Sequence, residues 1–118
     1  MKRTFRVYFN GRKQHFDVFI ADNPASFRRR NKCHAYYIGA SGRKQRRGLF
    51  GYIHLGEVTH ELVSHELQHL IFDWVLTRKG MKFTPKNEER IATMTGDIAK
   101  SFWRKYQRWV SVDARKPP

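Results

Sequence analysis

The amino-acid sequence predicts an α+β fold in which an N-terminal sheet of about four strands, antiparallel or mixed, packs on two long helices. Apolar and polar residues alternate in short runs up to about residue 55, which is the period of half-buried strands. After Gly56 the apolar period becomes that of an α-helix. A length of 118 residues with 40% hydrophobic residues is enough for one domain with its own core. We therefore expect residues 1–118 to form a single domain.

The first two expected strands form a β-hairpin near the N-terminus. Apolar residues alternate over 5–9 and again over 16–20, and the turn-forming pair Asn10-Gly11 lies between the two runs. Asn23-Pro24 ends the second strand. Residues 25–32, which are rich in arginine, form either a short helix or a basic loop.

A second hairpin is expected from two further runs that are rich in Tyr, Ile and Phe. These runs are residues 34–38 and 49–55. The segment 39–48 between them contains three glycines and several Lys and Arg residues, so it is expected to be a basic loop at the tip of the hairpin.

Two helices are expected in the second half of the chain, at 59–78 and 85–110. Thr59 can cap the first helix, and Thr84-Pro85 is typical of the start of the second. The polar segment 111–118 is expected to be a flexible tail. The apolar residues at helical spacing are Val63, Leu67, Leu70, Ile71 and Trp74 in the first helix, and Ile91, Ile98, Phe102, Trp103, Tyr106 and Trp109 in the second.

The composition excludes several classes of protein. A single cysteine, Cys33, rules out an internal disulfide and fits a reducing compartment. No uncharged apolar run approaches the ~20 residues of a membrane span, and the charged N-terminus does not resemble a signal peptide. We therefore expect a cytoplasmic protein with no membrane partner, plausibly a monomer. The formal net charge of +14 suggests an acidic partner such as nucleic acid.

The charge is unevenly distributed along the chain. Residues 57–74 carry four Asp or Glu residues and no Lys or Arg, and they hold three of the six histidines. Lys and Arg would repel a cation, so this composition favours a site for a divalent metal ion. A helix with one charged face is the alternative interpretation.

A motif within this segment has a specific chemical meaning. His65-Glu66-Leu67-Gln68-His69 has the pattern His-Glu-x-x-His. On a helix, His65 and His69 lie on one face about 6 Å apart, so both imidazoles can bind one tetrahedral ion. Glu66 lies beside the ion and can act as a general base toward water. The alternative is a helix with two unliganded histidines on its polar face.

A catalytic zinc ion normally has a third protein ligand. Glu89 is favoured because Ala92, Gly96 and Ala99 follow it on the same helix face, and small residues allow a close approach of two helices. Glu88 is the alternative, and it precedes a bulkier stripe suited to covering a sheet. The weaker candidates are His54, His60 and Asp73.

The His-Glu-x-x-His motif, followed by Glu89-x-x-Ala92 on a second helix, resembles the gluzincin metallopeptidases, in particular minimal single-domain members of this zincin group. The resemblance covers about residues 48–100. It implies a zincin-like fold and a zinc-dependent peptide hydrolase that binds one Zn²⁺ per chain. His65, His69 and Glu89 would be its ligands and Glu66 its general base.

The resemblance also implies where a peptide substrate would bind. Residues 49–55 would form the edge strand that pairs with an extended substrate, with contacts from Tyr52, Ile53 and His54. This sequence has Thr93 where the family often has an acid, so Asp97 or Asp73 would have to orient a ligand histidine. His54 and Tyr106 are candidates to stabilise the oxyanion.

Three basic clusters surround this motif in the sequence. They could direct a peptidase to acidic or nucleic-acid-associated protein substrates. A non-catalytic zincin-fold module that binds nucleic acid or an acidic partner protein is the alternative function. The clusters consist of Arg28, Arg29 and Arg30, of Arg43, Lys44, Arg46 and Arg47, and of Lys100, Arg104 and Arg108.

Overall fold

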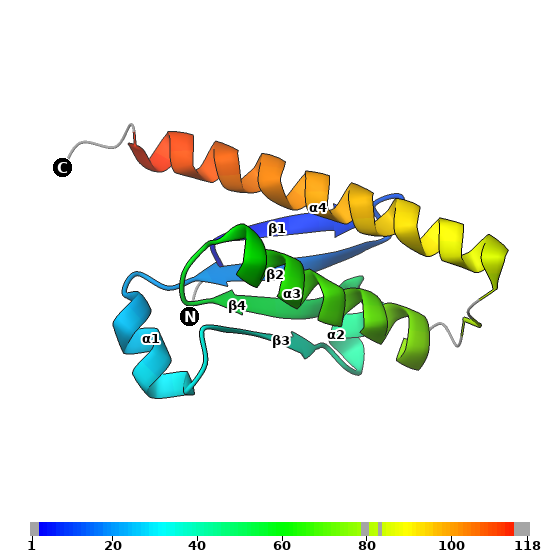
Figure 1. Ribbon diagram of the computed structural model, residues 1–118, viewed down its shortest axis with the longest axis horizontal. Helices are drawn as coiled ribbons and strands as arrows, with labels where there is room; N and C mark the ends of the chain where they lie inside the picture. The colour runs from blue at the N-terminus through cyan, green and yellow to red at the C-terminus, as the bar shows by residue number, and fades with distance from the viewer. Residues whose placement is uncertain (1–2, 79–80, 83, 115–118) are drawn as a thin grey trace.

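The computed structural model describes residues 3–78, 81–82 and 84–114, and it contains a four-stranded mixed sheet with the strand order β1-β2-β4-β3 (Figure 1). β1 pairs with β2 and β3 with β4 in antiparallel fashion, so both expected hairpins are confirmed. β2 and β4 are parallel, which makes the sheet mixed. The strands are β1 (Phe5–Phe9), β2 (Gln14–Ile20), β3 (Ala35–Gly39) and β4 (Leu49–Leu55).

The described residues form four α-helices, where the sequence predicted two long ones. The α+β class is confirmed. α1 corresponds to the short helix that was one of the two expectations for residues 25–32, whereas α2 lies in the segment 39–48, which was expected to be a loop. α1 forms because Asn23 caps it by accepting a hydrogen bond from the Ser26 amide, and Pro24 suits the first turn. The helices are α1 (Pro24–Asn31), α2 (Arg43–Arg46), α3 (His60–Phe72) and α4 (Pro85–Ala114), and a π-helical segment, η1 (Asp73–Arg78), continues α3.

α4 extends beyond its expected end. The apolar stripe stops at Trp109, which led to a predicted end at residue 110, yet the helix continues through Ala114. No proline or glycine interrupts residues 111–114, so backbone hydrogen bonding can continue without further packing. The predicted helix end at residue 110 is therefore wrong, and residues 115–118 of the expected tail lie outside the described part of the chain.

α3 and α4 cover one face of the sheet and enclose the core (Figure 1). Strand side chains on this face pack against the inner sides of both helices. Within the described chain, no helix is both long enough and apolar enough to cross a membrane. Core residues that are at most 1% exposed include Val7, Phe16, Val18, Ile53, Leu55, Leu70, Trp74, Ile98 and Phe102.

β4 is an inner strand, although residues 49–55 were expected to form the edge of the sheet. The parallel strand β2 pairs with one side of β4, and the hairpin partner β3 pairs with the other. The edge strand beside α3 is therefore β3, and the other edge strand, β1, lies beside α4. The hairpins could be predicted because their strands are adjacent in the sequence. β2 and β4 are distant in the sequence, so no local pattern predicts their parallel pairing.

Candidate metal centre

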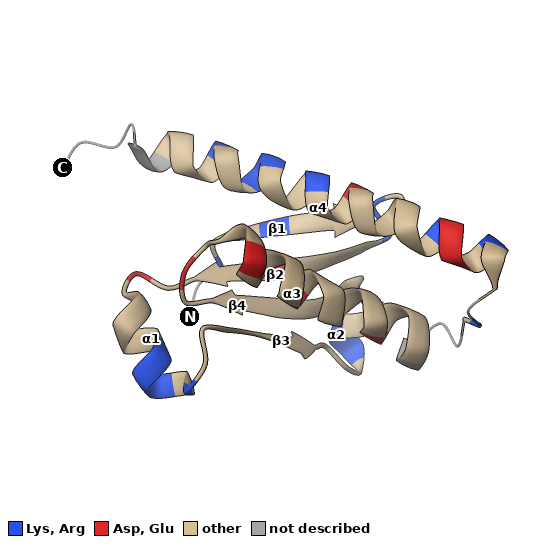
Figure 2. Ribbon diagram, in the orientation of Figure 1, with Lys and Arg blue, Asp and Glu red and all other residues tan. Residues whose placement is uncertain are grey.

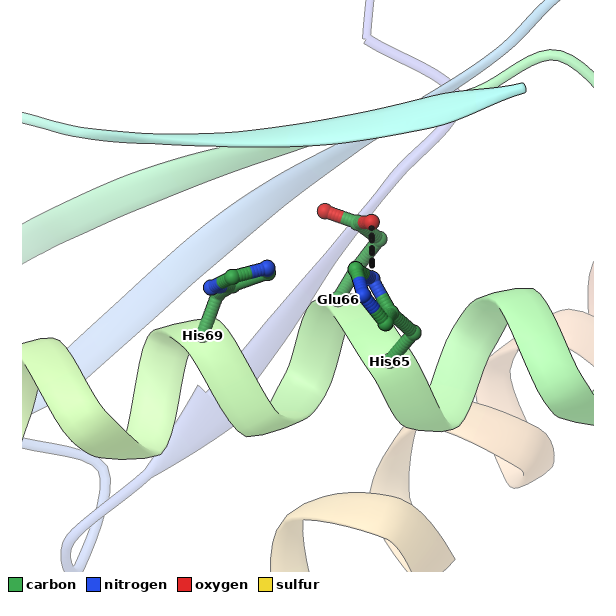
Figure 3. A group of neighbouring side chains, drawn as sticks. All are labelled: His65, Glu66 and His69. Atoms are coloured by element: carbon green, nitrogen blue, oxygen red, sulfur yellow. Dashed lines mark hydrogen bonds and ion pairs between the residues drawn. The ribbon is translucent and has the colours of Figure 1, made fainter. Parts of the chain in front are cut away.

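His65, Glu66 and His69 form a group on α3 that could hold a metal ion. One potential ligand atom from each residue lies within 4.8 Å of the other two. The imidazole ring centroids are 4.8 Å apart, and both rings are exposed. Figure 3 shows the three side chains projecting from the same side of α3, toward the sheet. α3 begins at His60 because Thr59 caps it by accepting a hydrogen bond from the Leu62 amide.

Glu66 is buried, whereas the two histidines are not. Its side chain is one residue further around the helix and is directed to the interior, where it is 3% exposed. Oε1 lies 2.9 Å from Nδ1 of His65, and a proton on Nδ1 would leave Nε2 of that ring available to a metal ion. Oε2 is buried and has no hydrogen-bond partner.

A buried carboxylate oxygen without a partner is costly in a folded protein. Carboxylate oxygen and imidazole nitrogen are both donor atoms for zinc and for other divalent transition metals. A metal ion, or a water molecule placed by one, would satisfy the unpartnered oxygen of Glu66. The residues present therefore fit a bound cation.

The two glutamates expected to complete the site lie elsewhere. Glu88 and Glu89 are exposed in the first turns of α4, and neither belongs to the group around His65. Glu89 lines a cavity of about 700 Å³ between α4 and the β1–β2 turn, together with Asn10, Arg12 and Trp74. The structure does not bring it to the histidines.

The packing of α4 explains this position. Gly96, in the middle of the small-residue stripe that favoured Glu89, makes no helix contact, because a Cβ added to it would have no atom within 4 Å. The bulkier stripe faces the sheet instead, with Ile98 and Phe102 at most 1% exposed. α4 accordingly packs mainly on β1, and its first turns lie beside the β1–β2 turn.

The other candidate ligands are engaged in different contacts. The ring of His60 lies 4.3 Å from that of Trp103 on α4. His54 stacks between Phe19 and Tyr36, with centroid distances of 4.5 Å to each ring. Burial lowers the pKa of His54 below its ordinary value.

The expected substrate residues also lie away from the group. Ile53 is in the core, so Tyr52 and His54 point to the opposite face of the sheet from α3. The structure does not bring any of the three to His65. Tyr106 packs with Trp103 and Trp109 along α4.

Asp73 and Tyr37 lie close to His69. The Tyr37 hydroxyl, from β3, donates a 2.6 Å hydrogen bond to Oδ2 of Asp73. Both residues line a hollow of about 420 Å³ that also includes His69, Phe72 and Leu76. Asp73 was considered in the sequence, but Tyr37 was missed.

A signal for Tyr37 was nonetheless present. Gly51 lies in the middle of β4, and a Cβ there would be 2.7 Å from the Tyr37 hydroxyl oxygen. A glycine inside a strand often marks a close approach of another group. Here it leaves room for the ring that reaches Asp73.

The basic residues lie on three separate elements (Figure 2). Those of α1 and α2 flank the two ends of the β3–β4 hairpin, and those of α4 lie along that helix. The side chain of Arg46 is outside the described part of the structure. The exposed members are Arg28, Arg29, Arg30, Arg43, Lys44, Arg47, Lys100, Arg104 and Arg108.

Comparisons of the chain with protein-family models, with curated proteins and with solved structures gave no match. The function of the site must therefore follow from its residues and their geometry.

Proposed function

We propose that this protein is a zinc-dependent metallopeptidase in which His65 and His69 bind the ion and Glu66 is the general base. The observation that carries the proposal is the Glu66 carboxylate, which is buried beside two exposed imidazoles and leaves Oε2 without a partner. A helix face that merely carried two histidines would have no need of such a group.

Zinc is the preferred ion because two imidazoles at this spacing suit its tetrahedral coordination. When bound, zinc would act as a Lewis acid that polarises a carbonyl and makes a water molecule more acidic. Glu66 would accept the proton of the attacking water and pass it to the leaving amine. Glu88 and Glu89 lie outside the group, so the proposal rests on the two histidines as protein ligands.

The surroundings of the site support an extended peptide as substrate. β3 is an edge strand beside α3, so its free side can pair with the main chain of a peptide. Phe72 and Leu76 are 46% and 55% exposed in the hollow that contains His69, and they could contact an apolar substrate side chain. The Tyr37 hydroxyl already donates its one proton to Asp73, so it could donate to a developing oxyanion only if that bond were broken.

Zinc content and cleavage of an unstructured protein test the proposal together. We expect about one zinc per chain in the wild type and in Glu66→Gln, with cleavage lost in that variant. His65→Ala should lose both metal and activity. His60→Gln is the matched control, because it removes a histidine of the same helix that lies outside the group. A wild type that purifies without zinc and cannot be reconstituted would refute the proposal.

A further inference from the structure

The face of the sheet opposite α3 and α4 carries a row of aromatic side chains. Phe19 of β2, His54 of β4 and Tyr36 of β3 are cross-strand neighbours. Their rings are stacked, with planes 7° and 11° apart. Phe27 of α1 extends the row, with its ring centroid 6.0 Å from that of Tyr36. Stacking holds each ring in place, so binding of a ligand would not have to pay the entropic cost of ordering these side chains.

A hollow of about 460 Å³ lies where this row meets α1. Tyr36 and His54 line it from the sheet, and Arg30 and Asn31 line it from the helix. Arg30 is exposed, so its guanidinium is available to an anion. Asp22 also lines the hollow and could accept hydrogen bonds from an amino or hydroxyl group.

A second hollow, of about 340 Å³, lies at the opposite end of the β3–β4 hairpin. It is lined by Tyr52, Ser41, Arg43 and Lys44, among others. The ammonium nitrogen of Lys44 lies over the Tyr52 ring, 5.6 Å from its centroid. A flat ring and two exposed cations therefore share one hollow.

The two hollows repeat the same combination of aromatic ring and cation. They lie at the two ends of β3, whose five residues place them about 13 Å apart. The buried acid of this face does not offset the cations, because Asp17 is paired with Arg6 at 2.8 Å and approached by Arg3 at 3.9 Å. The face thus has aromatic groups in its middle and cations at both ends along the strand direction.

We propose that this face binds single-stranded nucleic acid, with the strand running along β3 and β4. One base stacks on Tyr52, another enters the hollow beside Tyr36 and His54, and phosphates pair with Arg30, Arg43 and Lys44. Paired bases in a duplex could not stack on the rings. An acidic peptide would pair with the cations but would leave the aromatic rings unused. This binding site is on the opposite side of the sheet from the metal centre and goes beyond the proposed peptidase function.

Fluorescence anisotropy with labelled oligouridine and oligodeoxyuridine tests the proposal. Two double variants remove the same charge: Arg43→Gln with Lys44→Gln on the open face, and Arg104→Gln with Arg108→Gln on α4. We expect the first to weaken binding about tenfold or more and to lower the slope of log K against log salt by about 1.4, which corresponds to two lost phosphate contacts. The α4 pair should leave that slope unchanged.

Aromatic and catalytic variants complete the test. Tyr52→Leu keeps an apolar side chain but should weaken binding at least about fivefold through lost stacking. Glu66→Gln should bind as the wild type does, whether or not the peptidase proposal holds. Binding of either oligonucleotide that shows these variant effects supports the proposal, and a lack of binding to both would contradict it. A difference between the two oligonucleotides reports whether the 2′-hydroxyl is read.

Four further results would overturn it. Equal weakening by the two double variants would show attraction to a polycation without a site. Unchanged affinity in Tyr52→Leu would exclude stacking. Equal affinity for a duplex, or displacement of the oligonucleotide by polyglutamate at equal charge, would show that the face recognises negative charge alone and would favour an acidic protein as its partner.

Discussion

Glu66, the proposed general base, shows at the scale of one residue how a buried polar group can oppose stability. Its Oε2 atom is buried without a partner, which costs free energy in the metal-free protein. Glutamine has the same size and carries no full charge. Sites of this kind are commonly less stable than the surrounding fold permits.

We therefore expect Glu66→Gln to raise the free energy of unfolding of the metal-free protein by about 1 kcal/mol. Urea unfolding after treatment with a chelator measures this change. Glu61→Gln is the control, because Glu61 is exposed in the first turn of α3, where a negative charge favours the helix. Its substitution should lower stability slightly. Destabilisation of Glu66→Gln as well would show that Oε2 is satisfied within the protein.

His54 links the stability of the sheet to pH. Burial lowers the pKa of His54 in the folded state below its ordinary value, so the folded state disfavours the charged form. The unfolded chain binds the proton more readily, and the stability that His54 contributes is complete above about pH 6.5. It is lost as the pH falls through the folded-state pKa.

His54→Phe, which preserves the stacked row, should reduce the loss of stability between pH 7.5 and 5.5. Unfolding free energies of both proteins at the two pH values check this expectation. Some pH dependence should remain, because burial also lowers the pKa of His15. An identical pH dependence in the variant and the wild type would contradict the assignment to His54.

At the scale of elements, two glycines, each inside a regular element, differ in the space around them. Gly96 is exposed on α4, and an added Cβ would have no atom within 4 Å. Gly51 in β4 would place a Cβ 2.7 Å from the Tyr37 hydroxyl oxygen and 2.9 Å from the Ile38 carbonyl oxygen. Sequence alone assigned Gly96 to a helix contact that the structure does not contain.

The same substitution should therefore have opposite effects at the two positions. Gly96→Ala should stabilise the protein by about 0.5–1 kcal/mol through helix propensity. Gly51→Ala should destabilise it by about 1–3 kcal/mol, because the neighbouring ring and backbone would have to move. Thermal and urea unfolding give both values. If Gly96→Ala were the destabilising change, α4 would have to pack through its small-residue stripe.

Local patterns predicted the elements better than their arrangement. The hairpins and the His-Glu-x-x-His group depend on residues close in sequence, and the structure brings those residues together. The inner position of β4 and the contact of Tyr37 with Asp73 depend on residues that are distant along the chain. Two stripes of α4 could have faced the sheet, and the one that buries more apolar surface does so. This stripe contains Ile98 and Phe102.

At the scale of the whole molecule, the excess of cations should oppose folding at low salt. The chain has 24 Lys and Arg residues against 10 Asp and Glu residues. Arg104 lies one helical turn from both Lys100 and Arg108 on α4, and all three are exposed. Like charges at this spacing repel each other by about 0.2–0.5 kcal/mol per pair.

Arg6 carries the same charge in a different environment. Its Nε atom donates a 2.8 Å hydrogen bond to Oδ1 of the buried Asp17. This hydrogen bond is the main cause that raises the pKa of Arg6. Removal of Arg6 would leave a buried carboxylate with a weaker partner, Arg3.

Arg104→Gln and Arg6→Gln should therefore change stability in opposite directions. At about 10 mM salt, where the screening length is about 30 Å, Arg104→Gln should stabilise the protein by about 0.5 kcal/mol. At about 1 M salt the length falls to about 3 Å, and this gain should largely disappear. Arg6→Gln should destabilise by about 1 kcal/mol at both salt concentrations, because the lost contact is short and partly buried. Urea unfolding at the two salt concentrations distinguishes a repulsive surface charge from a paired charge. If both substitutions stabilised the protein, the total charge and not the position of each charge would determine stability.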